Sequence, residues 1–383
     1  MSKLSTQPYK GTRDFYPEDF RVRQYIFDKW REVCQSFGYE EYDASVIEPL
    51  ELYTSKTSEE IVREQTFSFT DRGGREVTLR PEMTPSVSRM VAGRRMELGY
   101  PLRLFSIPNC FRYERMQRGR TREFWQLNAD LFGVEGIDAE IEMLLLMHKL
   151  MKVFDATEEM YEIRINSRKL MNEIISKSNP KVTEAEIVRL IDAYDKLSTA
   201  DFTSKLGELV DDTQPIVDFL SGNIEPNEEL QTLLATAKDY GMGNVRFVPA
   251  VARGFDYYTD IVFEVFDLDP ENNRAMFGGG RYDGLVGQFN VEPVPTVGIA
   301  PGDVTMMNFL ETHQLLPQLT TKNDMYLMVE SENQLAGAQK YAQSLREQGK
   351  NVAVDLSGRK IDKQFKTAKK LGFSDEQIQR FEN

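Results

Sequence analysis

Two stretches of alternating polar and apolar residues, separated by a glycine-containing turn, constrain the fold of this chain most strongly. Residues 66–70 alternate, residues 71–74 read Asp-Arg-Gly-Gly, and residues 76–80 alternate again. This pattern predicts a β-hairpin, whose two strands run antiparallel. Residues 101–112 and 123–132 predict a second pair of strands, joined by an arginine-rich loop. We therefore expect an α+β fold built on an antiparallel sheet.

Helical patterns occur on both sides of these strands. Apolar residues recur at three- to five-residue steps over residues 17–37, and Gly38 supplies a stop signal. Residues 168–240 are polar and rich in Glu, Asp, Lys and Leu, with prolines as punctuation. They predict a helical domain inserted into a core that is formed by residues 1–167 and 241–320.

A different pattern begins near residue 323. Strand and helix signals alternate from Met325 onward, which is typical of an α/β domain. We expect residues 323–383 to form a partial domain of this kind. The remaining expected elements are a helix over about 138–154, strands over 245–248, 257–266, 275–277, 326–329 and 352–354, and helices over about 333–348 and 359–371.

The composition excludes several classes of protein. With 47 Lys and Arg against 61 Asp and Glu, the formal net charge is −14, so nucleic acid could be bound only through local basic patches. Two cysteines and two histidines argue against a disulfide framework and against a zinc hydrolase with several histidine ligands. No apolar run reaches 18 residues and the N-terminus lacks an apolar signal core, so we expect a cytoplasmic protein without a membrane span.

The loop of the second strand pair is basic. Six arginines and two glutamates lie between Arg103 and Glu123, a local charge of +4. Guanidinium groups suit phosphates because they donate paired, directional hydrogen bonds and stay charged. Arg112 and Glu114 lie two residues apart at a strand end, so we expect them on one face. A solvated hairpin loop with Arg–Glu pairs would have the same composition, and the residues alone leave both interpretations open.

A second candidate site is the segment Arg80-Pro81-Glu82-Met83-Thr84-Pro85. A carboxylate and a hydroxyl beside a turn constrained by proline could hold an ammonium group. The same residues could begin a helix, with Thr84 as the N-cap and Pro85 at the first helical position. The two interpretations are compatible with each other.

Two glycine-containing segments complete the candidate sites. Gly254 follows Arg253 in the segment 252–259, and a glycine there allows a ligand to approach the backbone closely. Three successive glycines at 278–280 would let a backbone pass against a substrate, although a plain glycine-rich turn is the alternative. Neither segment has the spacing of a dinucleotide-binding or phosphate-loop motif.

In this order and spacing, the segments resemble histidyl-tRNA synthetases, a family of class II aminoacyl-tRNA synthetases. The resemblance runs from residue 9 to about residue 372. The helix over 20–37 with the segment 39–53 resembles motif 1, which lies at the family's dimer interface. Residues 111–122 and the strand after them resemble motif 2. Residues 252–259 and 278–285 resemble two histidine-specific signatures.

The resemblance implies a role for each matching residue. Glu82, Met83 and Thr84 would contact the histidine substrate. Gln126 and Asp130 would line the amino-acid pocket, and the family usually has glutamate where this chain has Asp130. The remaining histidine-binding residues implied in this way are Tyr257 and Tyr258, at the imidazole and ammonium ends, together with Arg112 and Arg253.

The resemblance also implies how ATP is held. Arg112 would bind the α-phosphate and the substrate carboxylate, and Arg253 would act electrostatically beside the same phosphate, which makes both catalytic residues. Glu114 would contact the adenine. Apart from the resemblance, Arg118 and Arg120 in the motif 2 loop are the candidates to bind the γ-phosphate, because Thr305 stands where the family has an ATP-binding arginine.

The chain departs from the family pattern in three places. Thr305 stands where motif 3 normally has an ATP-binding arginine, and no arginine lies between Arg281 and Arg346. Ser45 replaces the usual motif 1 proline. The anticodon-binding module normally continues with further strands, whereas eleven mostly polar residues, 373–383, follow the last matching segment here.

These features lead to one expected function and one alternative. We expect a homodimeric histidine–tRNA ligase, which uses ATP with Mg²⁺ to form histidyl-adenylate and transfers histidine to tRNA(His). The departures keep a second interpretation open. It is a synthetase-like regulatory subunit of ATP phosphoribosyltransferase, which shares the core architecture without charging tRNA.

Overall fold

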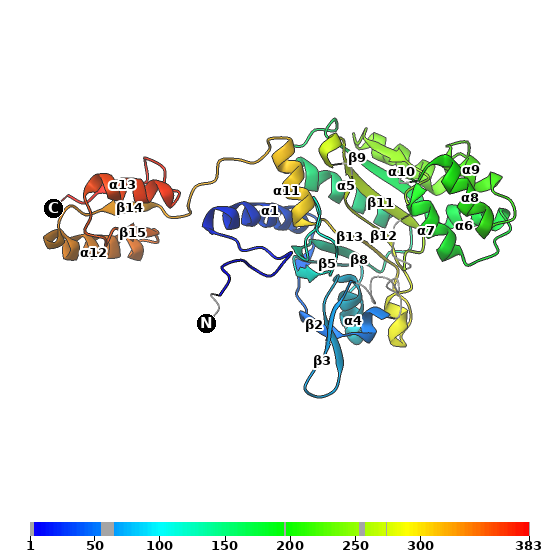
Figure 1. Cartoon of the computed structure of the whole chain (residues 1–383), viewed down its shortest axis with the longest axis horizontal. Coiled ribbons are helices and arrows are strands. Elements are labelled where there is room, and N and C mark those ends of the chain that lie inside the picture. The colour runs from blue at the N-terminus through cyan, green and yellow to red at the C-terminus, as the bar shows by residue number, and fades with distance from the viewer. Residues whose placement is uncertain (1–3, 55–64, 195–196, 253–256, 273, 383) are drawn as a thin grey trace. The chain divides into compact units, whose positions relative to one another are not determined.

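The computed structural model describes residues 4–54, 65–194, 197–252, 257–272 and 274–382 (Figure 1). The chain divides into two compact units. The larger comprises Met1–Asp14 and Ile26–Leu315, and the smaller comprises Phe15–Tyr25 and Leu316–Asn383. Arg253 and the first glycine signature up to Asp256 lie outside the described residues.

The helices and strands follow one another in a mixed order. The α-helices are α1 Pro17–Ser36, α2 Glu51–Thr54, α4 Thr84–Arg94, α5 Asp138–Lys152, α6 Arg168–Lys177, α7 Glu184–Asp192, α8 Thr199–Leu209, α9 Gln214–Leu220, α10 Glu228–Asp239, α11 Asp303–Thr312, α12 Glu332–Glu347 and α13 Ile361–Lys370, and two 3₁₀ helices are η2 Pro270–Asn272 and η3 Val286–Phe289. The strands are β1 Glu40–Glu41, β2 Ile47–Pro49, β3 Phe67–Thr70, β4 Glu76–Leu79, β5 Leu102–Ser106, β6 Asn109–Phe111, β7 Glu123–Trp125, β8 Asn128–Phe132, β9 Tyr161–Ser167, β10 Val245–Phe247, β11 Ile261–Asp267, β12 Ala275–Arg281, β13 Thr296–Ile299, β14 Met325–Met328, β15 Val352–Val354 and β16 Ile378–Arg380.

An eight-stranded sheet forms the core of the larger unit, in the order β1-β5-β8-β13-β12-β11-β9-β10. Neighbouring strands are antiparallel except for the pairs β1–β5 and β9–β10. All residues of β8 and β13 are buried, so these central strands are covered on both faces. Helix α5 packs on β13 and on α10. The predicted α+β fold with an antiparallel sheet is confirmed.

The second pair of predicted strands is broken into shorter strands. Each long strand divides near its middle, at Pro108 on one side and at Gln126 on the other. Pro108 has no N–H to donate, although its carbonyl accepts from Gln126 N at 3.0 Å. The inner parts, β5 and β8, join the large sheet, and β6 and β7 form a separate two-stranded ribbon. The arginine-rich loop therefore extends from the ribbon and not from the main sheet.

Two of the alternative local interpretations are wrong. The three glycines at 278–280 lie inside strand β12 and do not form a turn. The N-cap of α4 is Met83, whose side chain makes no capping hydrogen bond, and Thr84 is already helical. The proline after Thr84 still occupies the start of the helix, as its fixed φ angle favours.

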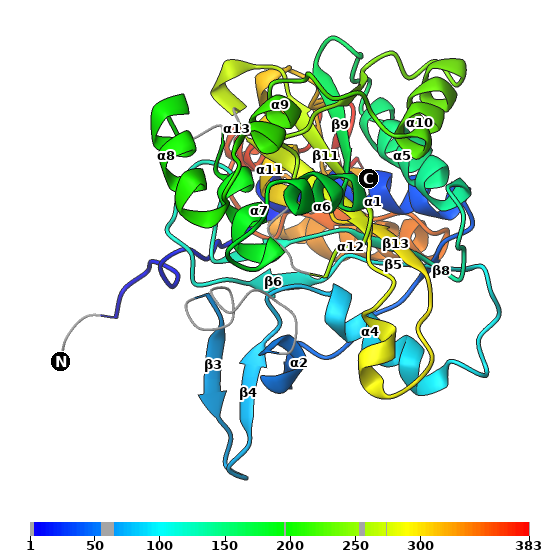
Figure 2. The ribbon, with the colours of Figure 1, turned by 90° about the vertical axis from the view of Figure 1, so that its right-hand side faces the viewer.

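The predicted hairpin at residues 66–80 is present as β3 and β4, which pair antiparallel and continue into β2 in the order β2-β4-β3. Figure 2 shows β3 and β4 projecting from the body of the larger unit. Strand β4 leads directly into residues 80–83 and helix α4. The hairpin therefore sets where the segment with Glu82 begins.

The described part of residues 168–240 holds five helices, α6 to α10. Three of them, α6, α8 and α10, are capped by short polar side chains, because Ser167, Ser198 and Asn227 each accept a hydrogen bond from the backbone N–H three residues on. The smaller unit contains a parallel sheet in the order β15-β14-β16 with α12 and α13. Strand β16 lies within the last eleven residues, where sequence patterns predicted no strand.

Candidate active site

Seven of the predicted site residues line one cavity of the larger unit. They come from the β4–α4 junction, the end of β6, the β7–β8 segment and the residues just before β11, and they are Glu82, Thr84, Arg112, Gln126, Asp130, Tyr257 and Tyr258. The strand predicted from residue 257 begins only at Ile261, so both tyrosines precede it. Met83 is fully buried and does not line the cavity; its Sδ atom lies 3.9 Å from Arg80 Nη1. The structure does not describe Arg253.

Glycines make room for this cavity inside the sheet. Gly278 and Gly279 of β12 and Gly298 of β13 are part of its lining. A Cβ atom on Gly279 would lie 1.9 Å from the carbonyl oxygen of Gly298, and one on Gly298 would lie 2.1 Å from Asp130 Oδ1. No side chain fits at these two positions, so the floor of the cavity is bare backbone.

Two carboxylates are held by tyrosines in the cavity. The Tyr257 hydroxyl donates a hydrogen bond to Glu82 Oε2 at 3.0 Å. The Tyr282 hydroxyl donates to Asp130 Oδ1. The pKa of Asp130 is raised to about 7, mainly by burial and to a smaller extent by the nearby charge of Glu82, although the Tyr282 hydrogen bond lowers it.

Three buried oxygen atoms in the cavity have no hydrogen-bond partner among the described residues. They are Gln126 Oε1, Asn128 Oδ1 and Asp130 Oδ2. Gln126 is fixed in orientation because its Nε2 donates to Ala300 O at 3.0 Å. Buried acceptors without donors are costly, and a ligand that carries N–H groups would satisfy them.

Two arginines of the same region lie near Glu114. Arg112 Nε donates to Pro81 O at 2.9 Å, and its Nη1 lies 4.0 Å from Glu114 Oε1. Arg120 Nη1 lies 2.9 Å from Glu114 Oε2. Glu114 and Arg120 line a second hollow together with Tyr113 and other residues of the motif 2 loop.

Thr305 lies against the motif 2 loop. Its hydroxyl donates to Met276 O at 2.6 Å, and a Cβ atom on Gly119 would lie 3.5 Å from its Cγ2 atom. Arg118 is anchored elsewhere, since its Nε donates to Asn272 Oδ1 at 3.0 Å. Arg118 and Arg120 flank Gly119. Of these two, Arg120 is the one that lines the second hollow, where it pairs with Glu114.

Sequence reasoning gave no role to five lining residues, which are Asn128, Tyr282, Gly298, Ile299 and Ala300. Asn128 lies midway between Gln126 and Asp130, so the two-residue period of a strand could have found it. Tyr282 lies two residues after the three glycines, within the segment 278–285 that resembles a histidine-specific signature. The closeness of Gly298 to Asp130 could not be predicted, because it arises only from the pairing of β13 with β8.

The two histidines have structural partners outside the cavity. His148 Nδ1 lies 3.0 Å from the Tyr161 hydroxyl, and His313 Nε2 lies 2.8 Å from Asp267 Oδ1. Across the described ranges, no group of three or more His, Cys, Asp or Glu side chains could hold a metal ion. None of the helices in the described part of the chain is both long and apolar enough to cross a membrane.

The fold of the larger unit is that of class II histidyl-tRNA synthetases. A solved histidyl-tRNA synthetase from Nostoc has a TM-score of 0.79, with 22% identity, 97% of this chain covered and 90% of that chain. A Bacillus halodurans protein, described as an ATP phosphoribosyltransferase regulatory subunit/histidyl-tRNA synthetase, has a TM-score of 0.77, with 23% identity and coverage of 99% and 98%. Identities this low establish the fold alone.

Sequence comparison identifies the family. The family model for histidyl-tRNA synthetase matches residues 11–302. The histidine–tRNA ligase of Leptospira biflexa is 40% identical, with 97% of this chain and 89% of the relative covered. The chloroplastic/mitochondrial histidine–tRNA ligase of Arabidopsis thaliana is 34% identical, with coverage of 96% and 79%. The chain belongs to the histidyl-tRNA synthetase family.

The raised pKa of Asp130 predicts a pH-dependent stability in the ligand-free protein. The pKa rises from the usual 3.8 to about 7, so between these values the folded state keeps a proton that the unfolded chain has lost. The free energy of unfolding should therefore fall as pH rises from about 4 to 7. Asp130→Asn removes this component, so the variant should gain stability relative to the parent across that range, by on the order of a few kcal/mol.

Urea unfolding of the parent and Asp130→Asn at intervals between pH 5 and 8 checks this prediction. The difference between their unfolding free energies should change with pH and level off above about pH 7. A difference that is constant over the whole range would show that Asp130 does not titrate there in the folded state.

Proposed function

We propose that this protein is a histidine–tRNA ligase, which activates histidine with ATP and transfers it to tRNA(His). The observation that carries the proposal is the cavity itself. Its lining combines the acidic side chains of Glu82 and Asp130, buried acceptors that have no partner among the described residues, and the cation of Arg112. An amino acid with an N–H-bearing ring, joined to a phosphate, matches this distribution of charge.

Histidine would bind beside the carboxylates. We propose that Glu82, Thr84 and Gln126 hold the ammonium group, with Tyr257 fixed on Glu82. Asp130 and Tyr258 would meet the imidazole. Gln126 Oε1 and Asp130 Oδ2 have no partner among the described residues, so a ring or amine without matching N–H groups would leave them unpaired. A polar pocket of this kind rejects the wrong ligand strongly.

Adenylation requires charge neutralisation more than covalent work by the protein. A histidine carboxylate oxygen attacks the α-phosphorus of ATP, and pyrophosphate leaves. Arg112 would contact the α-phosphate and the carboxylate, and family resemblance assigns Arg253 to the same phosphate. One preorganised contact of this type contributes roughly 3–4 kcal/mol to transition-state stabilisation. We propose that Mg²⁺ enters with ATP as a ligand of its phosphates.

ATP would extend from Arg112 toward the motif 2 loop. We propose that Glu114 contacts the adenine and that Arg120 helps to hold the phosphates, in place of the arginine that Thr305 replaces. The proximity of Gly119 to Thr305 supports this, because it brings the loop with Arg120 to the position of the missing cation.

Transfer to tRNA requires a basic surface on an acidic protein. On α13 and just before it, Arg359, Lys363, Lys366 and Lys370 are exposed at spacings of four, three and four residues. Such a stripe lies on one side of a helix. We propose that it contacts tRNA phosphates, within a partial anticodon-binding domain at residues 323–383.

The remaining assignments follow the family. We propose a cytoplasmic homodimer in which the motif 1 segment contributes to the interface. The catalytic core would comprise residues 1–167 and 241–320, with residues 168–240 as a helical insertion.

Amino-acid-dependent ATP–pyrophosphate exchange tests the proposed function. Histidine alone among the twenty amino acids should stimulate exchange, because its ring supplies the N–H donors that the buried acceptors need. Histidine binding without exchange for any amino acid would instead favour the regulatory-subunit interpretation. No binding and no exchange would overturn both.

The motif 2 loop generates a second prediction. Arg120→Ala should raise KM for ATP roughly tenfold, equivalent to about 1.4 kcal/mol, with KM for histidine little changed. Arg118→Ala is the matched control in the same loop, and its effect on KM for ATP should be smaller because Asn272 and Thr312 hold its guanidinium. Equal effects of the two variants on KM for ATP would contradict the assignment to Arg120.

The basic stripe generates a third prediction. Changing both Lys363 and Lys366 to Ala should weaken tRNA binding and reduce the slope of log affinity against log salt by roughly 1–2 units, since each phosphate contact contributes about 0.9. Pyrophosphate exchange should stay at the parental rate. The control is the double change of Lys340 and Lys350 to Ala, which removes two exposed lysines elsewhere on the same unit. Identical slopes for the two double variants would show that α13 is merely a solvated face.

A further inference from the structure

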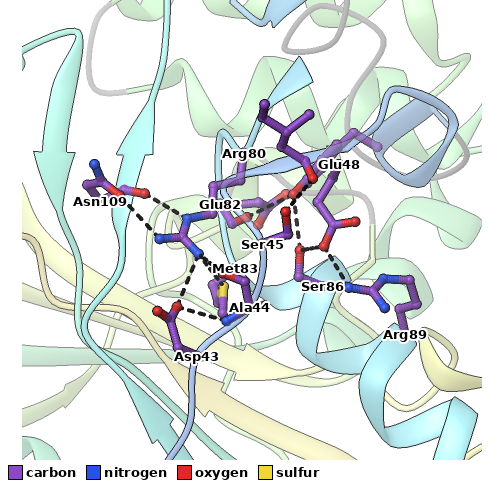
Figure 3. Close-up of polar contacts among 12 residues, drawn as sticks. Asp43, Ala44, Ser45, Glu48, Arg80, Glu82, Met83, Ser86, Arg89 and Asn109 are labelled. Atoms are coloured by element: carbon purple, nitrogen blue, oxygen red, sulfur yellow. Dashed lines mark hydrogen bonds and ion pairs between the residues drawn. The ribbon is translucent and has the colours of Figure 1, made fainter. Parts of the chain in front are cut away.

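Arg80 is a buried arginine two residues before Glu82, whose carboxylate lines the cavity. It is 2% exposed. Its Nε donates to Asn109 O at 2.8 Å and its Nη2 donates to Asn109 Oδ1 at 3.2 Å. Its Nη1 donates to Ala44 O at 2.8 Å and to Asp43 Oδ1 at 3.3 Å (Figure 3). One guanidinium group therefore joins residues 43–44 to the start of β6.

The buried contacts of Arg80 contribute little net stability to the fold. A buried cation loses its hydration, and only strong pairing repays that loss. The side chain of Asp43 is 79% exposed, so water screens its charge, and the other three acceptor atoms are neutral. The guanidinium instead fixes the relative position of two separate segments, because its planar donors point toward them in fixed directions.

The backbone around Arg80 extends the same connection to Arg112. Arg80 N donates to Val46 O and Phe111 N donates to Arg80 O, both at 2.9 Å. Arg112, the next residue after Phe111, then donates from Nε to Pro81 O at 2.9 Å. Successive contacts at Arg80 and Pro81 thus set where the Arg112 guanidinium lies.

Glu82 is held from another direction. The Tyr53 hydroxyl donates to Glu82 O at 3.3 Å and lies 3.3 Å from Ser86 Oγ. Ser86 in turn donates to Glu48 Oε1 at 2.9 Å, which anchors this side on β2 (Figure 3). Tyr257 holds the carboxylate of Glu82 itself. None of these contacts involves Arg80.

We propose that Arg80 is a positioning residue that sets the separation between Glu82 and Arg112. This inference rests on the proposed function, in which Glu82 binds the histidine ammonium and Arg112 binds the α-phosphate. If the guanidinium group is lost, the contacts that hold Glu82 remain, but Arg112 is no longer held at its position. The reacting carboxylate and phosphorus then lose their alignment while the histidine site survives.

Arg80→Lys tests this directly, because it keeps a buried positive charge and removes the fork. A single ammonium nitrogen cannot reach both Asn109 and Ala44 in the directions that the guanidinium uses. The kcat of histidine-dependent pyrophosphate exchange should fall about 10²-fold, which is the typical consequence of a displacement of about 1 Å at a reacting centre. The Kd for histidine, measured by calorimetry, should stay within about threefold of the parent.

Two further variants separate positioning from folding. Asn109→Ala removes one acceptor of the fork and should lower kcat by roughly tenfold, and it decides the question if Arg80→Lys does not fold. Arg103→Lys is the matched control. Arg103 lies in strand β5, and its Nε and Nη2 atoms donate to Glu142 Oε1 and Oε2 at 2.8 and 2.6 Å. It should lose stability in urea unfolding and keep the parental kcat per folded molecule.

The outcomes distinguish the inference from the function on which it rests. If the parent protein shows no histidine-dependent pyrophosphate exchange, the proposed function is overturned. The role of Arg80 between Glu82 and Arg112 is then overturned with it. With an active parent, the inference alone is overturned if kcat per folded molecule is unchanged in both Arg80→Lys and Asn109→Ala. It is also overturned if Kd for histidine rises as much as kcat falls, because Arg80 would then support the position of Glu82.

Discussion

The site depends on one packing constraint. A pocket inside a sheet needs strands that carry glycine, and so no side chain, at the positions where the pocket lies. Protein interiors are close-packed, so buried strands normally fill the space above them. Here β12 and β13 approach so closely that a Cβ atom on Gly279 would lie 1.9 Å from Gly298 O. Glycine at 298 also leaves the space that the carboxylate of Asp130 occupies. The bare backbone makes the cavity, and polar side chains from neighbouring elements turn into it.

Polar groups placed in such a cavity must be satisfied, and here they are satisfied only in part. Tyrosine hydroxyls hold one oxygen of Glu82 and one of Asp130, and Asp130 Oδ2 stays without a partner among the described residues. Arg112, which lines the same cavity, is oriented by the carbonyl of Pro81. The cavity therefore brings acidic groups, an open acceptor and a cation together.

The structure also shows where this acidic chain concentrates its positive charge. Its basic residues are gathered in short segments, one in the loop after β6 and one on α13. In the loop, Glu114 pairs with Arg120, so the cations are held in place without being fully neutralised. Local placement matters more than the net charge of −14, because screening limits interactions between exposed charges to about 10 Å or less at physiological salt.

Sequence patterns predicted the elements that depend on local chemistry. The hairpin of β3 and β4 could be predicted because alternation and turn residues lie within fifteen positions of each other. The break at Pro108 could not, since the two halves of the long strand pair with different partners only after the sheet forms. The three glycines of β12 look like a turn in isolation. Only the pairing of β12 with β11 and β13 makes them part of a strand.

The sequence by itself determined which chemical groups are available and in what order, including Glu82, Thr84, Arg112, Gln126, Asp130, Tyr257 and Tyr258. It determined them because side-chain chemistry and spacing are local properties. Tertiary structure alone decided that these groups line one cavity, that Asn128, Tyr282 and Gly298 join them, and that Arg80 turns inward to connect two segments. The physical reason is that burial and hydrogen-bond partners depend on contacts between residues that are distant in the chain.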